Sequence, residues 1–188
     1  LAGAVVRPHH AYVLAGPDHI QKAVVEHMIR QHGCRRPVFL AGPPKNSDSE
    51  ERLQAYRCVL ERNGLPFDPS LVVCANFISS QAQVAMEDFL RRGIPFDCVI
   101  AANDAMAVGA IEVLRGSGRR VPGDIPVTGF DDLPVARLGP PRLTSVAQPF
   151  DEIANCTIDT IVDQLSGRPV PDRVVLPTRL VCRQSCGC

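Results

Sequence analysis

The chain has 188 residues and no formal net charge, because 20 lysines and arginines balance 20 aspartates and glutamates. This length allows one large domain or two small lobes with a buried core. A neutral chain creates no net field that attracts a polyanion, so we expect neither a nucleic-acid surface nor a membrane partner in it. Residues 1–7 lack the basic start and cleavage site of a signal peptide, and no apolar run approaches bilayer length.

The eight cysteines are too scattered to predict a secreted disulfide framework. Buried free cysteine behaves as a small hydrophobe and is typical of a reducing compartment, so we expect a cytoplasmic protein. Three of the cysteines lie in the tail, residues 182–188, and no CxxC or CxH pair elsewhere completes a set of four zinc ligands. We therefore expect no metal and no cofactor. Five cysteines occur singly: Cys34, Cys58, Cys74, Cys98 and Cys156.

Short apolar runs alternate with longer segments of helical period. The expected strands show little polar alternation and cover residues 12–14, 38–41, 71–75, 98–102, 126–129 and 174–176. Apolar residues recur at three and four positions in the segments between them, which predicts helices over 19–31, 49–63, 80–91, 105–115 and 150–165. Continuous apolar strands joined by helices indicate an α/β fold, a doubly wound parallel sheet covered on both faces.

Local residues support the limits of these helices. Ser49 and Asp104 are expected to open the second and fourth helices. Glycines that follow four helices are expected to end them: Gly33, Gly64, Gly93 and Gly116.

The alternation breaks at residues 131–149, which contain proline and glycine and show no clear period. Such a break indicates that the chain crosses between two lobes. We expect a partial N-terminal lobe in 1–33, a nearly complete C-terminal lobe in 34–132, the crossover and an N-terminal-lobe helix in 133–169, and returning strands and a tail in 170–188. Only about one strand–helix unit precedes residue 38, which is too little for a complete first lobe.

Polar and aromatic residues follow the predicted strands where a ligand would bind. In an open parallel sheet, ligands bind outside the carboxyl ends of the strands. Guanidinium and carboxylate groups can hold neighbouring hydroxyls, and an aromatic ring can stack on a sugar or a base. Taken singly, each residue also has a structural explanation, as a helix cap or a core side chain. Together they predict a site for a sugar-like or nucleoside-like molecule at Arg52, Phe77, Asn103, Asp104, Phe130 and Asp131.

Catalytic motifs are not found in the sequence. His27 and His32 lie five apart without the spacing of a zinc protease, and GPPKNSDSE lacks the pattern of a phosphate-binding loop. No GxSxG nucleophile motif occurs. The pair Asp131 and Asp132 would suit acid–base chemistry, but a solvated turn after a strand explains it equally well. We therefore expect a binding protein and not an enzyme.

The run from Phe96 to Pro149, which includes AANDAMAVGAIEVL and PVTGFDDLP, resembles the C-terminal lobe of the LacI/GalR family. The likeness extends upstream through VVEHMIRQHGCRRPVFLAGP and ERLQAY and downstream to the final strands. It implies a periplasmic-binding-protein-like fold, with the DNA-binding helix-turn-helix and most of the N-terminal lobe preceding Leu1. By position, it implies that Arg52 and Asp104 hold ligand hydroxyls and that Phe77 lines the pocket.

Two positions depart from the family pattern. Gly16 stands where many members have an aspartate, and Ala55 stands where they have a glycine. The first departure removes one expected polar ligand and puts sugar specificity in doubt.

The resemblance implies a small-molecule sensing domain of a homodimeric transcriptional regulator that contacts DNA only through a helix-turn-helix absent from this chain. Two alternatives stay open. The segment GPPKNSDSEERLQAYRCVL and the terminal RQSCGC also resemble sensor domains of multidomain signalling proteins with diguanylate-cyclase or histidine-kinase output. A solute-binding protein for transport would share the fold, and the sequence does not name the effector.

Overall fold

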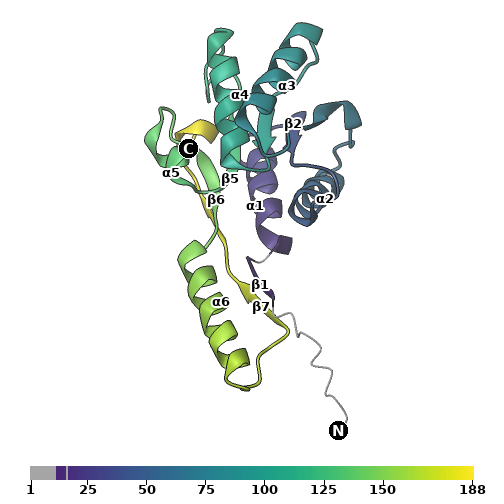
Figure 1. The fold of residues 1–188 in the computed structure, drawn as a ribbon. Helices are drawn as coiled ribbons and strands as arrows, with labels where there is room; N and C mark the ends of the chain where they lie inside the picture. Colours follow the sequence, from purple (N-terminus) through teal and green to yellow (C-terminus); the bar gives the residue numbers. More distant parts are fainter. Residues whose placement is uncertain (1–11, 16) are drawn as a thin grey trace. The chain divides into compact units, whose positions relative to one another are not determined.

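The structure is a computed structural model that describes residues 12–15 and 17–188. The chain forms two compact units, each built from two segments (Figure 1). The smaller unit comprises Leu1–Gly16 and Pro149–Thr178, and the larger comprises Pro17–Gln148 and Arg179–Cys188. These limits differ from the expected divisions at residues 33, 132 and 169. The reason is that helix α1, Pro17–Arg30, packs on helix α2 of the larger unit, and the last residues return to the same unit's sheet.

A six-stranded sheet forms the centre of the larger unit, in the order β3-β2-β4-β5-β6-β8. Its first five strands are parallel, as predicted, whereas β8 runs antiparallel to β6. Strand β6 was not predicted, because two of its four residues are polar. Strand β8 lies in the segment 170–188 where returning strands were expected, but its limits were not predicted because it has only three residues. The strands are β2 Pro37–Ala41, β3 Val72–Cys74, β4 Cys98–Ala101, β5 Val127–Asp131, β6 Thr144–Ala147 and β8 Arg179–Val181.

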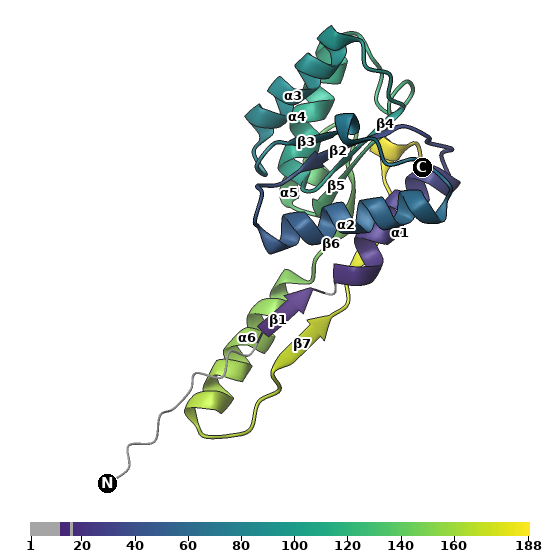
Figure 2. The same cartoon turned by 90° about the vertical axis from the view of Figure 1, so that its right-hand side faces the viewer.

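Helices cover both faces of this sheet. Helices α1 and α2 pack together on one face, and α3 and α4 pack together on the other (Figure 2). The helices of this unit are α1, α2 Ser47–Arg62, α3 Ser79–Arg92, α4 Asp104–Gly116 and the short α5 Pro134–Leu138, with 3-10 turns η1 Pro69–Leu71 and η2 Gln184–Cys186. The four longer helices match the prediction within about two residues, and α5 lies in the segment expected to be irregular.

The caps of two helices differ from those expected. Asn46, not Ser49, caps α2, and its side chain accepts a hydrogen bond from the Ser49 amide at 3.0 Å. Asn103, not Asp104, caps α4 in the same way. Gly33, Gly64 and Gly93 follow their helices with positive φ, whereas Gly116 is the last residue of α4 and has no positive φ.

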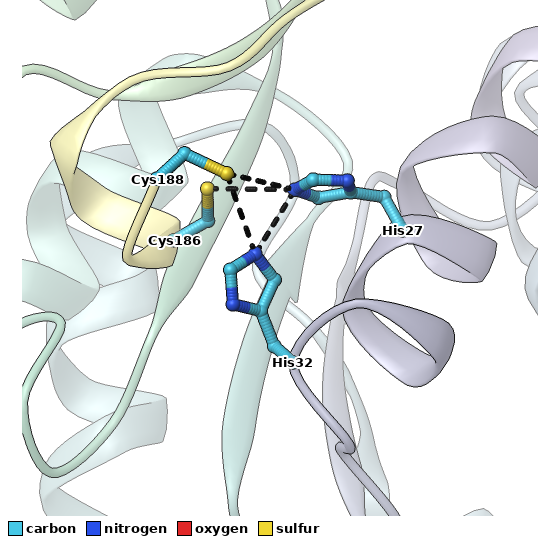
Figure 3. Close-up of side chains that lie close together, drawn as sticks. All are labelled: His27, His32, Cys186 and Cys188. Carbon is cyan, nitrogen blue, oxygen red and sulfur yellow. Dashed lines mark hydrogen bonds between the residues drawn. The ribbon is translucent and has the colours of Figure 1, made fainter.

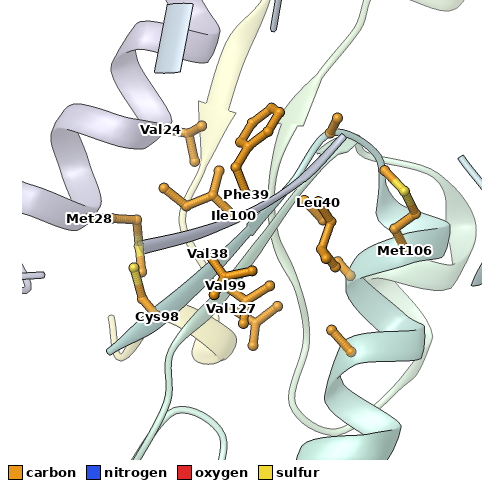
Figure 4. Close-up of a cluster of buried hydrophobic side chains, with 14 of the residues drawn as sticks. Val24, Met28, Val38, Phe39, Leu40, Cys98, Val99, Ile100, Met106 and Val127 are labelled. Atoms are coloured by element: carbon orange, nitrogen blue, oxygen red, sulfur yellow. The ribbon is translucent and has the colours of Figure 1, made fainter. Parts of the chain in front are cut away.

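The core lies on both sides of β2 and β4, in which every residue is buried (Figure 4). Covering both faces of a strand removes the need for polar alternation, which is why these strands read as continuous apolar runs. On the α2 side, the Tyr56 ring stacks on Phe39 at 4.9 Å, and its hydroxyl donates a 2.8 Å hydrogen bond to the Pro37 carbonyl. Burial raises the pKa of Tyr56, so this hydroxyl keeps its proton.

The smaller unit contains a two-stranded parallel sheet and one helix. Strand β1, Tyr12–Ala15, pairs with β7, Arg173–Leu176, and helix α6, Phe150–Leu165, contacts β1. No residue of α6 is buried, and its apolar side chains Ile158, Ile161, Val162 and Leu165 are exposed. Among the helices that the structure describes, none is long and apolar enough to span a bilayer.

Candidate functional site

Strained backbone is concentrated at the carboxyl ends of the strands. The described residues include five non-glycine residues with positive φ: Lys45, Asn76, Phe77, Asp131 and Asp132. All five lie at or just beyond the ends of β2, β3 and β5. A non-glycine residue in this region costs of order 1–3 kcal/mol, and such residues cluster where a protein holds functional groups. Backbone geometry therefore points to the same edge as the sequence prediction.

Arg52 lies at the centre of this edge. Its guanidinium donates a hydrogen bond to the Ala102 carbonyl at the end of β4 and lies 3.7 Å from Oδ1 of Asp131. The guanidinium carbon lies 3.8 Å from the centre of the Phe130 ring and 5.7 Å from that of Phe77. Only 12% of the side chain is exposed. Arg52 therefore brings together groups from the ends of β3, β4 and β5.

Asp131 is the carboxylate that faces Arg52. It ends β5, and its Oδ1 also accepts a 2.5 Å hydrogen bond from the side chain of Gln148. Burial raises the pKa of Asp131, and the positive charge of Arg52 opposes that shift. The side chain keeps 16% of its surface exposed. Asp131 is thus a partly accessible acceptor beside a donor.

Asn103 holds the loop that carries Phe77. Its side-chain amide donates to the Phe77 carbonyl at 3.1 Å, and its oxygen accepts from the Met106 amide at 2.9 Å as the cap of α4. The Phe77 ring covers Gly42, where an added Cβ would lie 2.2 Å from the end of the ring. Asn103 therefore positions Phe77 and the start of α4 together.

Asp104 is fully buried, which the resemblance did not imply. Its Oδ2 accepts from the Leu133 amide at 2.7 Å, and its Oδ1 accepts from the Ser145 hydroxyl at 2.6 Å. Burial raises the pKa of Asp104 to about 6. This carboxyl joins α4 to the segments after β5 and on β6, and Asp131 takes the position at the edge.

Phe130 is also placed differently from the expectation. Its side chain is buried, and its ring lies against the Arg52 guanidinium. A cation over an aromatic ring is stabilised by the ring's quadrupole. Phe130 therefore supports Arg52, whereas Phe77, which is only partly buried, remains the ring that a ligand can reach.

The neighbouring carboxylates Asp131 and Asp132 do not form a pair. Asp132 is buried and makes ion pairs with Arg183 at 2.6 Å and Arg137 at 3.0 Å. Asp131 instead faces Arg52. The two carboxylates therefore have separate cationic partners, which gives no acid–base pair.

The sequence prediction missed Gln148 and Ser145. Both belong to the segment around β6, which was expected to be irregular. The sequence carries little signal for them, because two of the four residues of β6, Thr144 and Ser145, are polar although all four are buried.

The tail cysteines, for which the sequence offered no CxxC or CxH partner pair, have two histidines as neighbours in the structure. Cys186 and Cys188, at the end of the larger unit's sequence, lie beside His27 and His32, which are near its beginning (Figure 3). Both histidines are partly buried.

The fold and the polar edge together define a ligand-binding lobe of the two-lobed α/β type. The chain belongs to the periplasmic binding protein-like domain family, which matches residues 25–186.

Regulators of the LacI/GalR type are among its homologues. It is 40% identical over 154 residues to the HTH-type transcriptional regulator CelR of Thermobifida fusca, covering 81% of this chain and 45% of the relative. It is 38% identical over 161 residues to the HTH-type transcriptional regulator GalR of Escherichia coli, covering 85% of this chain and 46% of the relative. The chain thus spans about half the length of these relatives.

Solved structures agree with this assignment. A transcriptional regulator CelR–cellobiose complex superposes with a TM-score of 0.88 at 36% identity, over 94% of this chain and 54% of the other. The lac repressor dimer bound to operator and the anti-inducer ONPF gives a TM-score of 0.85 at 27% identity, over 93% of this chain and 52% of the other.

Proposed function

We propose that this chain is the effector-binding part of a LacI/GalR-type transcriptional regulator and that it binds a sugar-like molecule at the edge formed by Arg52, Asp131 and Phe77. The observation that carries the proposal is the Arg52–Asp131 pair at 3.7 Å, partly exposed beside an aromatic ring. The homologous structure of the CelR–cellobiose complex, a regulator with a sugar, supports this choice of ligand class.

The chemistry of the edge suits a polyhydroxylated molecule. A guanidinium offers N–H donors in a fixed fork, and a carboxylate offers only acceptors. Adjacent hydroxyls of a sugar can accept hydrogen bonds from the guanidinium and donate hydrogen bonds to the carboxylate. Phe77 adds an apolar surface on which the hydrogens of a sugar ring can rest. Burial strengthens these hydrogen bonds because little water competes for the groups.

We propose that ligand binding favours a closed arrangement of two lobes. The homodimer would transmit this conformational change to its output domain. Such a shift requires unequal affinity of the ligand for the open and closed forms. The relatives CelR and GalR are HTH-type regulators, and we place DNA binding in such a domain outside the matched residues. This favours transcription as the output over transport or other signalling.

An apolar groove between α4 and α5 is our candidate for the dimer interface. Its apolar lining includes Val108, Ile111, Val135, Leu138 and Leu143. Leu138 is 82% exposed, which is costly for a leucine in water. The lac repressor in the homologous structure is described as a dimer, and we propose a second copy of this chain as the occupant.

We propose a cytoplasmic location and a function without catalysis. All eight cysteines are free thiols, which suits a reducing compartment. The separate ion pairs of Asp131 and Asp132 favour binding over acid–base chemistry.

A ligand screen by thermal shift tests the proposal. The purified chain is heated with cellobiose, a panel of mono- and disaccharides, and a panel of nucleosides. A ligand that binds the folded state raises the midpoint of unfolding by mass action. We expect a saccharide to raise it and Arg52→Ala to reduce the shift at the same saccharide concentration. Arg57→Ala is the matched control, because Arg57 lies on the same helix but stacks on Phe67. A saccharide shift that is as large with Arg52→Ala as with the original chain would place the site elsewhere, and a shift with nucleosides alone would contradict the ligand class.

A further inference from the structure

Two histidines and two cysteines from opposite ends of the larger unit's sequence meet in one cluster (Figure 3). The four ligand atoms, two imidazole nitrogens and two sulfurs, all lie within 4.8 Å of one another. His27 is in the last turn of α1 and His32 is in the turn that follows. Cys186 ends η2, and Cys188 lies two residues further on.

Local backbone geometry holds both halves of the cluster. Helix α1 ends at Arg30, and the following turn brings the His32 ring to 4.8 Å from that of His27. Gly187 lies between the cysteines with φ of 102°, a conformation that side chains rarely adopt. An added Cβ on Gly187 would lie 3.6 Å from the His32 ring, so this glycine packs directly against the cluster.

Hydrogen bonds outside the cluster fix the cysteine half. Ser185, the middle residue of η2, is fully buried. Its hydroxyl accepts from the Thr144 amide at 2.8 Å and donates to the Val127 carbonyl at 2.6 Å. These bonds attach η2 to β5 and β6 without help from the histidines. The cluster is therefore preorganised on a rigid part of the sheet.

The three nitrogen–sulfur separations given below fall within the range of a tetrahedral zinc site, and the nitrogen–nitrogen separation is somewhat shorter. Zinc binds nitrogen at about 2.0–2.1 Å and thiolate sulfur at about 2.3 Å, so neighbouring ligand atoms of a tetrahedron lie roughly 3.3–3.8 Å apart. The Nε2 atom of His27 lies 3.0 Å from that of His32, 3.6 Å from the Cys186 sulfur and 3.5 Å from the Cys188 sulfur. The distance from Cys188 to Nε2 of His32 is 3.6 Å.

Hydrogen bonding by itself accounts poorly for this arrangement. The Nε2 atom of His27 faces three other ligand atoms, and a fourth, the Cys182 sulfur, lies at 3.8 Å. An imidazole nitrogen carries at most one hydrogen, so it can donate to one of these neighbours only. Lone pairs that converge on one point are what a cation requires.

We propose that His27, His32, Cys186 and Cys188 bind one Zn²⁺ ion as a structural site. Two thiolates neutralise the ion's charge, and binding releases the two thiol protons. Four protein ligands leave no open position, which is typical of a structural zinc site and not of a catalytic one. The ion would join the end of α1 to the η2 segment, and so would stabilise the larger unit independently of any effector.

Metal content and cobalt spectroscopy test this site directly. The reduced chain is incubated with Zn²⁺, desalted and analysed for metal by mass spectrometry, and we expect about one zinc ion per chain. Replacement by Co²⁺ should give the visible bands of a tetrahedral cobalt ion and a near-ultraviolet thiolate-to-cobalt band. These signals report coordination without any activity assay.

The test variant is Cys188→Ser combined with His32→Gln, and the control is Cys58→Ser. Cys188 is exposed and His32 partly so, whereas Cys186 is buried against Thr144 and could unfold if changed. We expect the double variant to keep its circular dichroism spectrum, lose the zinc and the cobalt bands, and lose the rise in unfolding temperature that zinc gives the original chain. The control on α2 should keep all three.

Equal zinc content in the original chain and the folded double variant would overturn the proposal. So would a tetrahedral cobalt spectrum without a thiolate band. If the double variant unfolds, the single variant His32→Gln is tested in the same cobalt assay. Loss of one nitrogen ligand must change the tetrahedral bands, so unchanged bands would overturn the proposal.

Discussion

Arg52 of α2 and Asp131 at the end of β5 face each other across the carboxyl edge of the sheet, with 3.7 Å between Nη2 and Oδ1. They are 12% and 16% exposed, so each remains within reach of a bound molecule while most of its surface is dry. Such a pair presents a donor and an acceptor side by side. The proposed binding of hydroxyl groups depends on this relationship.

Loss of the Arg52 guanidinium should weaken saccharide binding. Arg52→Ala leaves Asp131 without its cation and removes the donors that would meet a hydroxyl. We expect a loss of about 1–3 kcal/mol in binding free energy, which is about 5- to 150-fold in Kd. Isothermal titration with the best saccharide from the thermal-shift screen measures this loss. Arg57→Ala should leave the Kd unchanged, and equal losses in both variants would mean that the effect is not local.

Replacing Asp104 should change how stability depends on pH. Its pKa is about 6 in the folded chain against an ordinary value of 3.8, chiefly because burial disfavours the charged form. The folded state therefore holds the proton more tightly than the unfolded state. The stabilisation that this gives is complete below about pH 3.8 and is lost as the pH rises through about 6.

The variant Asp104→Asn cannot ionise and lacks this dependence. We expect the original chain to lose stability relative to Asp104→Asn between pH 4.5 and pH 7.5. Urea unfolding at both pH values gives the difference in free energy of unfolding. A difference that stays constant with pH would show that Asp104 titrates normally in the folded chain.

Gly129 on β5 should not tolerate a side chain. A Cβ added there would lie 2.3 Å from Oδ1 of Asp104 and 2.8 Å from the Leu143 side chain. We expect Gly129→Ala to lower the free energy of unfolding by about 1–3 kcal/mol through overpacking. Gly116→Ala is the control, because nothing lies within 4 Å of a Cβ at this helical position. Gly116→Ala should leave the free energy of unfolding unchanged or raise it by a few tenths of a kcal/mol. Chemical denaturation of both variants measures these free energies.

A charge at Leu138 should separate the proposed dimer. Leu138 is 82% exposed beside the α4–α5 groove, and burying a glutamate there would require desolvating its charge. We expect Leu138→Glu to convert a dimer into a monomer in size-exclusion chromatography with light scattering. Val84→Glu on α3, where the valine is 66% exposed, changes charge equally and should stay dimeric. A dimer with Leu138→Glu would place the interface on another surface.

Local patterns were sufficient for much of the fold. Strands β2 and β4 are apolar throughout because helices cover both of their faces, so composition alone identified them. Helices α2, α3 and α4 repeat apolar residues at three and four positions, which is a property of one helix and needs no knowledge of its neighbours. Strand β6 escaped because it is short and two of its residues, Thr144 and Ser145, are polar yet buried.

Some of the residues predicted for the site come together at one edge of the sheet, and ligand binding there stays a prediction. The rule for parallel sheets places residues after β3, β4 and β5 together, and Arg52, Phe77 and Asp131 do meet there. Asp104 and Asp131 both follow strands, so their residue type and position could not distinguish them. Packing decided that Asp104 is buried against Ser145 and Leu133 while Asp131 faces Arg52.

The sequence by itself determined the class of fold and the polar residues that follow each strand, because hydrophobic periodicity and the succession of strands and helices along the chain are local properties. The tertiary structure decided which carboxylate is accessible and that His27 and His32 meet Cys186 and Cys188. Those outcomes depend on contacts between residues separated by up to 161 positions. Spacing in the chain carries no information about such pairs, because their distance is set by how the sheet and its helices pack.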